Sequence, residues 1–288
     1  MLNLGLAVAL IGMLSFAVSD TFAKSVSVRW GNKRATFALL VLSVLPMVIS
    51  IPFLGLGGLD GFAIGISALS GVFYMLAYLL MYKSLETEQV ANTISLSGIE
   101  YAIIALFGIL ILGEGVTKLD VLCFAGIFIG IFFVTTTAKF RFNRNYFPAL
   151  LGMVFFGGTY ILLDYVSKGS GGLLALLLVN RIVAITLMAL YLRIAPERRR
   201  IVKNRKTFSM WDSTLMFAVF TGILNGMGAI SLLALALLNF VAVGSVIVAA
   251  EAAVVIFLGY LIYKEKFERR QIIGFVLLSA CVMVLSVL

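Results

Sequence analysis

The sequence has no histidine and only two cysteines among its 288 residues. The absence of histidine removes the commonest metal ligand and the side chain whose charge changes most readily near neutral pH. Cys123 and Cys281 both fall inside apolar segments, which indicates small interior residues rather than a disulfide. The sequence also contains no phosphate-binding loop, zinc-ligand spacing or nucleophile elbow. We therefore predict that the protein is not an enzyme and holds no metal or other cofactor.

Charged residues are also scarce, at 12% of the sequence, whereas apolar residues make up 62% and the mean hydropathy is +1.13. In soluble domains about a quarter of the residues are charged. A chain this apolar cannot cover a surface that faces water, so lipid must surround most of it. The composition therefore predicts an integral membrane protein.

A helix that crosses a membrane needs about 20 largely apolar residues. Along this chain that rule predicts an all-α protein with ten transmembrane helices and mostly short connections. The predicted spans lie near residues 3–23, 35–55, 61–82, 90–113, 119–137, 146–166, 172–193, 213–237, 241–263 and 270–288.

Lysine and arginine are shared unevenly between the two predicted membrane faces. Of the 22 basic residues, 19 lie in the connections 1–2, 3–4, 5–6, 7–8 and 9–10, and the exceptions are Lys118, Lys168 and Arg181. The positive-inside rule then makes the odd-numbered connections cytoplasmic and places both termini outside the plasma membrane. The net charge of +9 follows from this orientation and from anionic headgroups, so it does not indicate a nucleic-acid partner.

The two halves of the chain repeat each other at a separation of 151 residues. This shift aligns Ser70–Glu114 with Thr221–Glu265 without a gap and superposes Glu100 on Glu251. In the first half the basic connection is the one between its own first and second helices, whereas in the second half the basic connections are those between its second and third and its fourth and fifth helices. Because five is odd, the second half enters the membrane in the opposite orientation. The sequence therefore predicts two inverted five-helix repeats, residues 1–140 and 141–288.

These features resemble a known family. In each half the fourth helix closes with an apolar run into Gly-Glu or Lys-Glu, within Tyr82–Glu114 and Val241–Glu265. With the two five-helix halves and the segment Gly12–Lys24, this pattern resembles the EamA-like branch of the ten-helix drug/metabolite transporter superfamily. The resemblance implies a central cavity lined by helices 1–4 and 6–9, with helices 5 and 10 packed outside. The proline that commonly follows the fourth-helix glutamate is replaced by Tyr101 and Ala252, so the resemblance does not predict a kink there.

Glu100 and Glu251 are the first candidates for a substrate-binding site. Repeat symmetry places both near the middle of the membrane, where transporters with inverted repeats bind substrate. A carboxyl group in apolar surroundings can hold a proton and release it when water enters. The pair therefore predicts cation binding or proton coupling, and the alternative is a hydrogen-bonded glutamate that joins one helix to another.

Asn92 and Ser97 share one face of the fourth helix with Glu100, whereas the equivalent face of the ninth helix is almost wholly apolar. A cavity with one polar and one apolar side suits an amphipathic solute. We therefore include Asn92 and Ser97 among the substrate-binding candidates.

Arg181 lies deep in the seventh span, and its guanidinium matches a carboxylate or a phosphate. With the two glutamates it could hold a zwitterion, and an internal ion pair with an acidic residue is the equal alternative. Tyr74 and Asn225, which are equivalent under the 151-residue shift, and Tyr160 in the sixth span could line the same cavity. Their polar groups could equally bind helices together.

Further ionisable residues lie near the ends of spans and are predicted to form gates or structural ion pairs: Asp164, Asp20, Lys24, Glu114 and Glu265. A GxxxG pair, Gly126 and Gly130, permits close helix approach either within the protein or between two copies, so the protein is a monomer or a homodimer.

The function predicted from these features is secondary active transport of a small amphipathic metabolite such as an amino acid or an organic amine. Inverted repeats predict alternating access around a midplane site, and the central glutamates allow proton coupling. The alternative is a scramblase or flippase, because a half-apolar cavity could admit a lipid headgroup.

Overall fold

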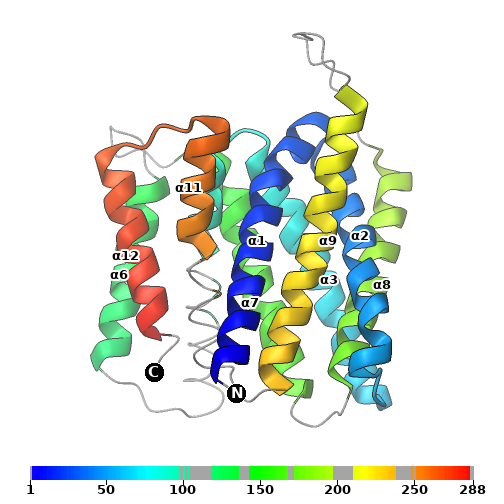
Figure 1. Ribbon diagram of the computed structural model, residues 1–288. Helices are drawn as coiled ribbons and strands as arrows, with labels where there is room; N and C mark the ends of the chain where they lie inside the picture. Colours follow the sequence, from blue (N-terminus) through cyan, green and yellow to red (C-terminus); the bar gives the residue numbers. More distant parts are fainter. Residues whose placement is uncertain are drawn as a thin grey trace.

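The computed structural model describes residues 2–97, 100, 103, 118–135, 143–167, 172–196, 210–237, 248 and 251–285. All regular secondary structure within these residues is helical (Figure 1). The elements are α1 (Leu2–Trp30), α2 (Asn32–Leu54), α3 (Gly61–Leu85), α4 (Val90–Ile94), the 3₁₀ turn η1 (Ser95–Ser97), α6 (Lys118–Thr135), the 3₁₀ turn η2 (Arg144–Tyr146), α7 (Phe147–Ser167), α8 (Leu173–Ile194), α9 (Met210–Leu237), α11 (Glu251–Tyr263) and α12 (Arg269–Leu285).

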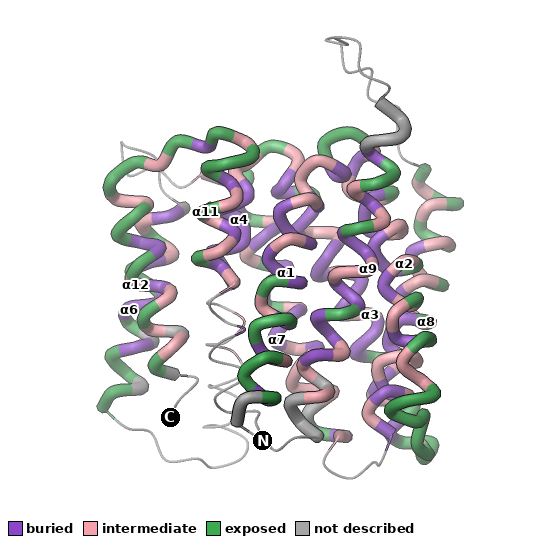
Figure 2. The backbone as a smooth tube through the Cα atoms, in the orientation of Figure 1, coloured by how far each residue is buried: buried purple, intermediate pink, exposed green. Residues whose placement is uncertain are grey.

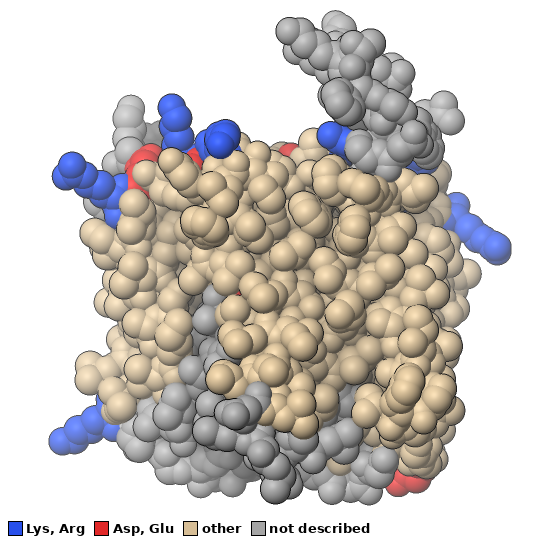
Figure 3. Space-filling model, in the orientation of Figure 1, with Lys and Arg blue, Asp and Glu red and all other residues tan. Residues whose placement is uncertain are grey.

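The outer surface of the bundle is apolar, as expected for contact with lipid. Six described helices are long and apolar enough to cross a membrane. Large apolar side chains point outward along them, among them Ile49, Phe53 and Phe62, which are 68%, 83% and 60% exposed. Figure 3 shows a wide uncharged belt, with lysine, arginine and acidic side chains gathered mainly at one end of the molecule. The prediction of an all-α, multi-pass membrane protein is confirmed.

Eight of the ten predicted spans coincide with a described helix, namely α1, α2, α3, α6, α7, α8, α9 and α12. The fourth span is described only as α4, η1 and two further helical residues, and the ninth mainly as α11. One boundary differs clearly from the prediction, because α1 continues to Trp30 instead of ending near residue 23. Gly31, with φ of 83°, ends that helix in a backbone conformation that favours glycine.

Packing within the bundle brings together helices that are distant in sequence. Helix α3 packs against α7 and α8, and α9 packs against α1 and α2 (Figure 1). Two glycines permit these close crossings. A side chain at Gly71 would collide with the carbonyl of Asn180 in α8, and one at Gly222 would collide with Leu42 in α2.

Helices α6 and α12 pack against each other at one edge of the bundle, where the family resemblance places the fifth and tenth helices (Figure 1). A Cβ at Gly126 would collide with Cys281 of α12, and one at Gly130 would lie 2.6 Å from Leu278. The GxxxG pair is thus accounted for by packing inside the protein. Neither Cys123 nor Cys281 is in a disulfide.

The start of α1 and the end of α12 lie at the same end of the bundle (Figure 1). Most of the basic side chains visible in Figure 3 lie at the opposite end. We refer to that opposite end as the basic end.

Candidate functional site

Buried polar side chains from α3, α8 and α9 are in contact with one another, and Figure 2 marks the buried residues of the bundle in purple. Residues four apart share a helix face, so α3 directs three polar groups to one side. The buried polar set consists of Ser70, Tyr74, Tyr78, Asn180, Arg181 and Asn225.

Arg181 is the charged member of this set and is only 2% exposed. Its Nη1 donates to Asn180 Oδ1 at 3.1 Å and its Nη2 to Asn225 Oδ1 at 3.5 Å. The guanidinium carbon lies 3.6 Å from the centroid of the Tyr74 ring, a cation–π contact. Its Nε has no hydrogen-bond partner, and no acidic side chain that the structure describes forms an ion pair with it. The direct contacts of this buried positive charge are therefore all with neutral groups.

Tyr74 and Asn225, which the repeat makes equivalent, are in direct contact. The Tyr74 hydroxyl donates to Asn225 Oδ1 at 2.9 Å, and Asn225 Nδ2 donates to the Tyr78 hydroxyl at 2.5 Å. The rings of Tyr74 and Tyr78 stack edge to face with centroids 4.8 Å apart. Asn180 Nδ2 donates to Ser70 Oγ at 2.8 Å. These bonds join α3, α8 and α9, so the same side chains hold helices together and position Arg181.

Three carboxyl groups from three helices lie close enough in the interior to interact. Glu100 interacts electrostatically with Asp20, and Glu251 interacts with both Asp20 and Glu100. The Tyr160 hydroxyl of α7 is within electrostatic range of both glutamates and of Arg181. Among the described residues no group of acidic or cysteine side chains could hold a metal ion. The structure therefore brings Glu100, Glu251, Arg181 and Tyr160 into one region and adds Asp20 to it.

Asp20 lies inside the bundle and not at the end of a helix, because α1 runs on for more than two turns beyond it. It is 7% exposed, and its Oδ1 has no hydrogen-bond partner. Lys24, one turn along α1, forms its ion pair with Glu265 instead. The prediction that Asp20 lies near the end of its span is therefore wrong, because α1 continues to Trp30.

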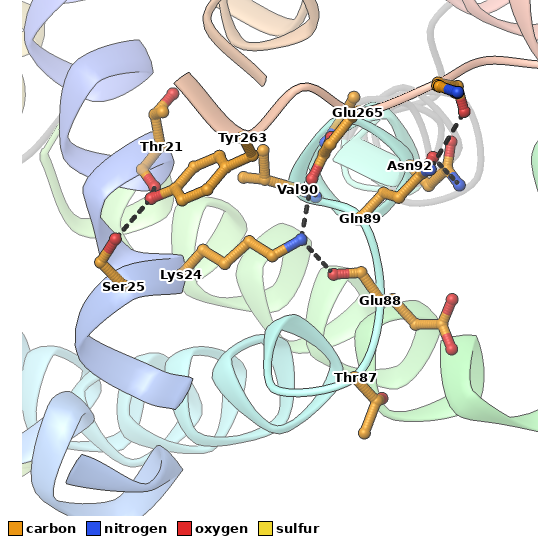
Figure 4. A network of polar contacts seen from close by, with 12 residues as sticks. Thr21, Lys24, Ser25, Thr87, Glu88, Gln89, Val90, Asn92, Tyr263 and Glu265 are labelled. Carbon is orange, nitrogen blue, oxygen red and sulfur yellow. Dashed lines mark hydrogen bonds and ion pairs between the residues drawn. The ribbon is translucent and has the colours of Figure 1, made fainter. Parts of the chain in front are cut away.

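Lys24 and Glu265 form a second polar cluster, at the basic end (Figure 4). Lys24 Nζ donates to Glu265 Oε1 and to the carbonyl of Glu88, both at 2.8 Å. The Glu265 carboxylate also accepts from the backbone N–H groups of Val90 at 2.8 Å and Ala91 at 3.2 Å. Beside it, the Tyr263 hydroxyl donates to the carbonyl of Thr21 at 2.8 Å. This cluster joins α1, the start of α4 and the connection between α11 and α12.

Asn92 belongs to the basic end and not to the acidic region. Its Nδ2 donates to the Tyr146 hydroxyl at 2.7 Å and to Gln89 Oε1 at 3.1 Å. Ser97 is buried in the 3₁₀ turn η1, where the chain tightens three residues before Glu100. The expected single face of Asn92, Ser97 and Glu100 assumed a regular α-helix, and the 3₁₀ turn breaks that spacing.

Two candidates cannot be placed. Glu114 lies outside the described residues, and the Asp164 side chain does as well, although its backbone belongs to α7.

Tyr78 follows Tyr74 at i+4, and this spacing already indicated a shared face whose polar groups could line the cavity or bind helices together. Sequence reasoning did not single out Tyr263 or Gly259 for the roles that they have. Gly259, the repeat partner of Gly108, lies where a Cβ would be 2.8 Å from Glu265 Oε2. Its recurrence in the repeat was the signal that a close approach occurs there.

Comparison with solved structures supports the fold. One matching crystal structure aligns over 96% of this chain and 97% of that chain with a TM-score of 0.62. Its sequence identity is 15%, so the similarity concerns the fold alone. No curated protein matches the chain.

Comparison with protein families gives a match that covers nearly the whole chain in two consecutive segments, residues 3–136 and 144–287. Both segments match the EamA-like transporter family, the family that the sequence resembled. The chain therefore belongs to the EamA-like transporter family, within the drug/metabolite transporter superfamily, and is a multi-pass membrane transporter.

Proposed function

We propose that this protein is a secondary active transporter that exports or exchanges a small amphipathic metabolite such as an amino acid or an organic amine. The observation that carries the proposal is the interior region where Glu100, Glu251 and Asp20 interact near a buried arginine without an acidic partner among the described residues. Ionisable groups inside a membrane protein are costly and mark substrate or ion pathways.

The proposed mechanism is alternating access between two inverted halves, residues 1–140 and 141–288. The exchange of packing partners supports it: α3 contacts α7 and α8, whereas its repeat equivalent α9 contacts α1 and α2. The Tyr74–Asn225 hydrogen bond joins residues 151 apart. Equivalent residues touch only near a symmetry axis, so this contact fits a pseudo-two-fold axis through the polar cluster. The two separate family matches fit the same division.

In this proposal Arg181 receives the carboxylate of a zwitterionic substrate. The guanidinium is already oriented by Asn180, Asn225 and the Tyr74 ring, and its Nε remains free. A buried charge is stable only with a compensating partner, and a substrate carboxylate would supply one. The substrate's ammonium group would then lie toward the carboxyl groups.

Proton coupling is the second part of the proposal. Three neighbouring carboxyl groups cannot all carry charge in an apolar interior without a compensating cation. Protons and the substrate ammonium would compete for Asp20, Glu100 and Glu251, which couples the movement of one to the other.

The proposed orientation has the basic end in the cytoplasm, so the odd-numbered connections are cytoplasmic and both termini lie outside the plasma membrane. The gathering of basic side chains at the end opposite the start of α1 supports it (Figures 1 and 3).

The test is uptake of phenylalanine and phenethylamine into proteoliposomes, with and without a proton gradient. The double variant Glu100→Gln, Glu251→Gln should lose gradient-driven transport, because the glutamine side chains cannot exchange protons. Glu268→Gln is the matched control, since Glu268 is 53% exposed in an ion pair with Arg270. Wild-type uptake by the double variant would contradict the role of the glutamates. Rapid dithionite bleaching of inner-leaflet fluorescent lipid, without solute uptake, would favour the scramblase alternative.

A further inference from the structure

Glu265, at the basic end, contacts the start of the chain segment that leads to Glu100 in the interior. Glu265 lies in the connection between α11 and α12, in the half of the chain opposite to its partners Lys24, Val90 and Ala91. Its side chain is 4% exposed, and its carboxylate accepts hydrogen bonds from all three (Figure 4). An ionised carboxylate this buried is stable only while its partners remain in place.

The local backbone is built to bring this carboxylate inside. Lys264, directly before it, has φ of 55°, a left-handed conformation that is unfavourable for a residue with a side chain. The Glu265 N–H returns to the carbonyl of Gly259 at 3.3 Å, which turns the chain inward. Gly259 leaves room for the carboxylate, because a Cβ there would lie 2.8 Å from Glu265 Oε2 and 3.1 Å from Val90. An ion pair on the protein surface needs neither a left-handed residue before the carboxylate nor a glycine that leaves room for it.

Val90 and Ala91 begin the segment that leads to Glu100. The chain forms α4 from Val90 to Ile94, tightens into the 3₁₀ turn η1 from Ser95 to Ser97, and is helical again at Glu100. A change from α to 3₁₀ within a helical segment commonly marks a hinge. The carbonyl of Glu100 packs against Gly157 of α7, where an added Cβ would lie 3.2 Å away. The segment is thus held at one end by Glu265 and at the other by α7.

We propose that Glu265 is a positioning residue that couples closure of the basic end to the position of Glu100. The proposal rests on the proposed alternating-access function. Because Lys24 and Glu265 belong to opposite halves, their contact must break when the basic end opens. The Glu265 carboxylate then loses its charge partner, becomes hydrated and releases the N–H groups of Val90 and Ala91. The segment from Val90 to Ser97 is then free to bend at η1, and this bending shifts Glu100 relative to Asp20 and Glu251.

Hydrogen–deuterium exchange of the full-length protein in lipid nanodiscs tests this coupling without any substrate. Glu265→Gln and Lys24→Met should each accelerate exchange across residues 92–97 at least about tenfold, because these amides are reached only through movement of the segment. Lys24→Arg, which keeps the charge and the donors, should exchange like the wild type. Glu268→Gln, an exposed acid in the same connection, is the matched control and should change nothing.

Acceleration confined to Val90 and Ala91 would overturn the proposal, because the gate would then open without moving the segment. Unchanged exchange in both Glu265→Gln and Lys24→Met would overturn it as well. If Glu265→Gln does not fold, Lys24→Met alone decides, since it leaves the carboxylate and the hydrocarbon stem in place. These outcomes are independent of transport, so the proposed function fails separately if the glutamate double variant still transports.

Discussion

At the scale of single residues, the interior charges explain why a zwitterion suits this protein. Arg181 is surrounded by an aromatic face and two amides, which orient the guanidinium but do not neutralise it. Asp20 has an unpartnered oxygen and lies near two further carboxyl groups. Buried charges of both signs that do not pair with each other are available to a ligand that carries both signs.

Replacing Arg181 should separate substrates by whether they carry a carboxylate. Arg181→Gln should reduce phenylalanine transport by about 10- to 100-fold, since a hydrogen bond to a charged group contributes roughly 1.5–3 kcal/mol. Phenethylamine, which lacks the carboxylate, should change less than about twofold. Proteoliposome uptake of the two compounds measures the difference. Equal losses for both would mean that Arg181 only supports the helices.

At the scale of helices, the crossing of α3 over α8 positions Arg181 and depends on one glycine. Gly71 packs on the carbonyl of Asn180, the residue before Arg181. Gly65 lies on the same helix with nothing within 4 Å of an added Cβ, so it provides a matched control.

Gly71→Ala should force α3 and α8 apart and destabilise the protein by about 1–3 kcal/mol, as overpacking does. Gly65→Ala should be neutral or stabilising by up to about 1 kcal/mol, because alanine favours the helix more than glycine. Thermal unfolding in detergent compares the two variants. The packing argument fails if Gly71→Ala melts at or above the temperature of Gly65→Ala.

Helix boundaries show what sequence reasoning could and could not predict at this scale. Hydropathy found the apolar spans, and the repeat identified the Tyr74–Asn225 pair whose contact the structure describes. Hydropathy misplaced the end of α1, because an apolar run ends at charged residues whereas the helix ends at Gly31. The 3₁₀ turn at Ser95 to Ser97 was also missed, since local composition does not signal it and the turn packs against the distant helices α7 and α12.

At the scale of the whole molecule, two polar regions have different roles in the proposed function. The interior region collects charges from α1, α8, α11 and the fourth span, whereas the Lys24–Glu265 cluster joins the two halves at the basic end. Their separation along α1 was not predictable from the sequence. Asp20 and Lys24 are one turn apart on α1. Lys24 pairs with Glu265 only because the connection after α11 brings that carboxylate next to it.

Orientation in the membrane is the remaining property of the whole molecule, and single-cysteine labelling tests it. Thr87, in the connection between α3 and α4, and Leu56, between α2 and α3, are both exposed. In a background with Cys123→Ala and Cys281→Ala, Thr87→Cys should react with an impermeant maleimide at least about tenfold faster in inverted vesicles than in right-side-out vesicles. Leu56→Cys should show the reverse preference. The positive-inside rule predicts these signs because the basic connections resist translocation, so labelling of Thr87→Cys from the outside would reverse the proposed topology. Such a reversal would also make the Lys24–Glu265 cluster an extracellular gate, and the direction of opening assigned to it would change accordingly.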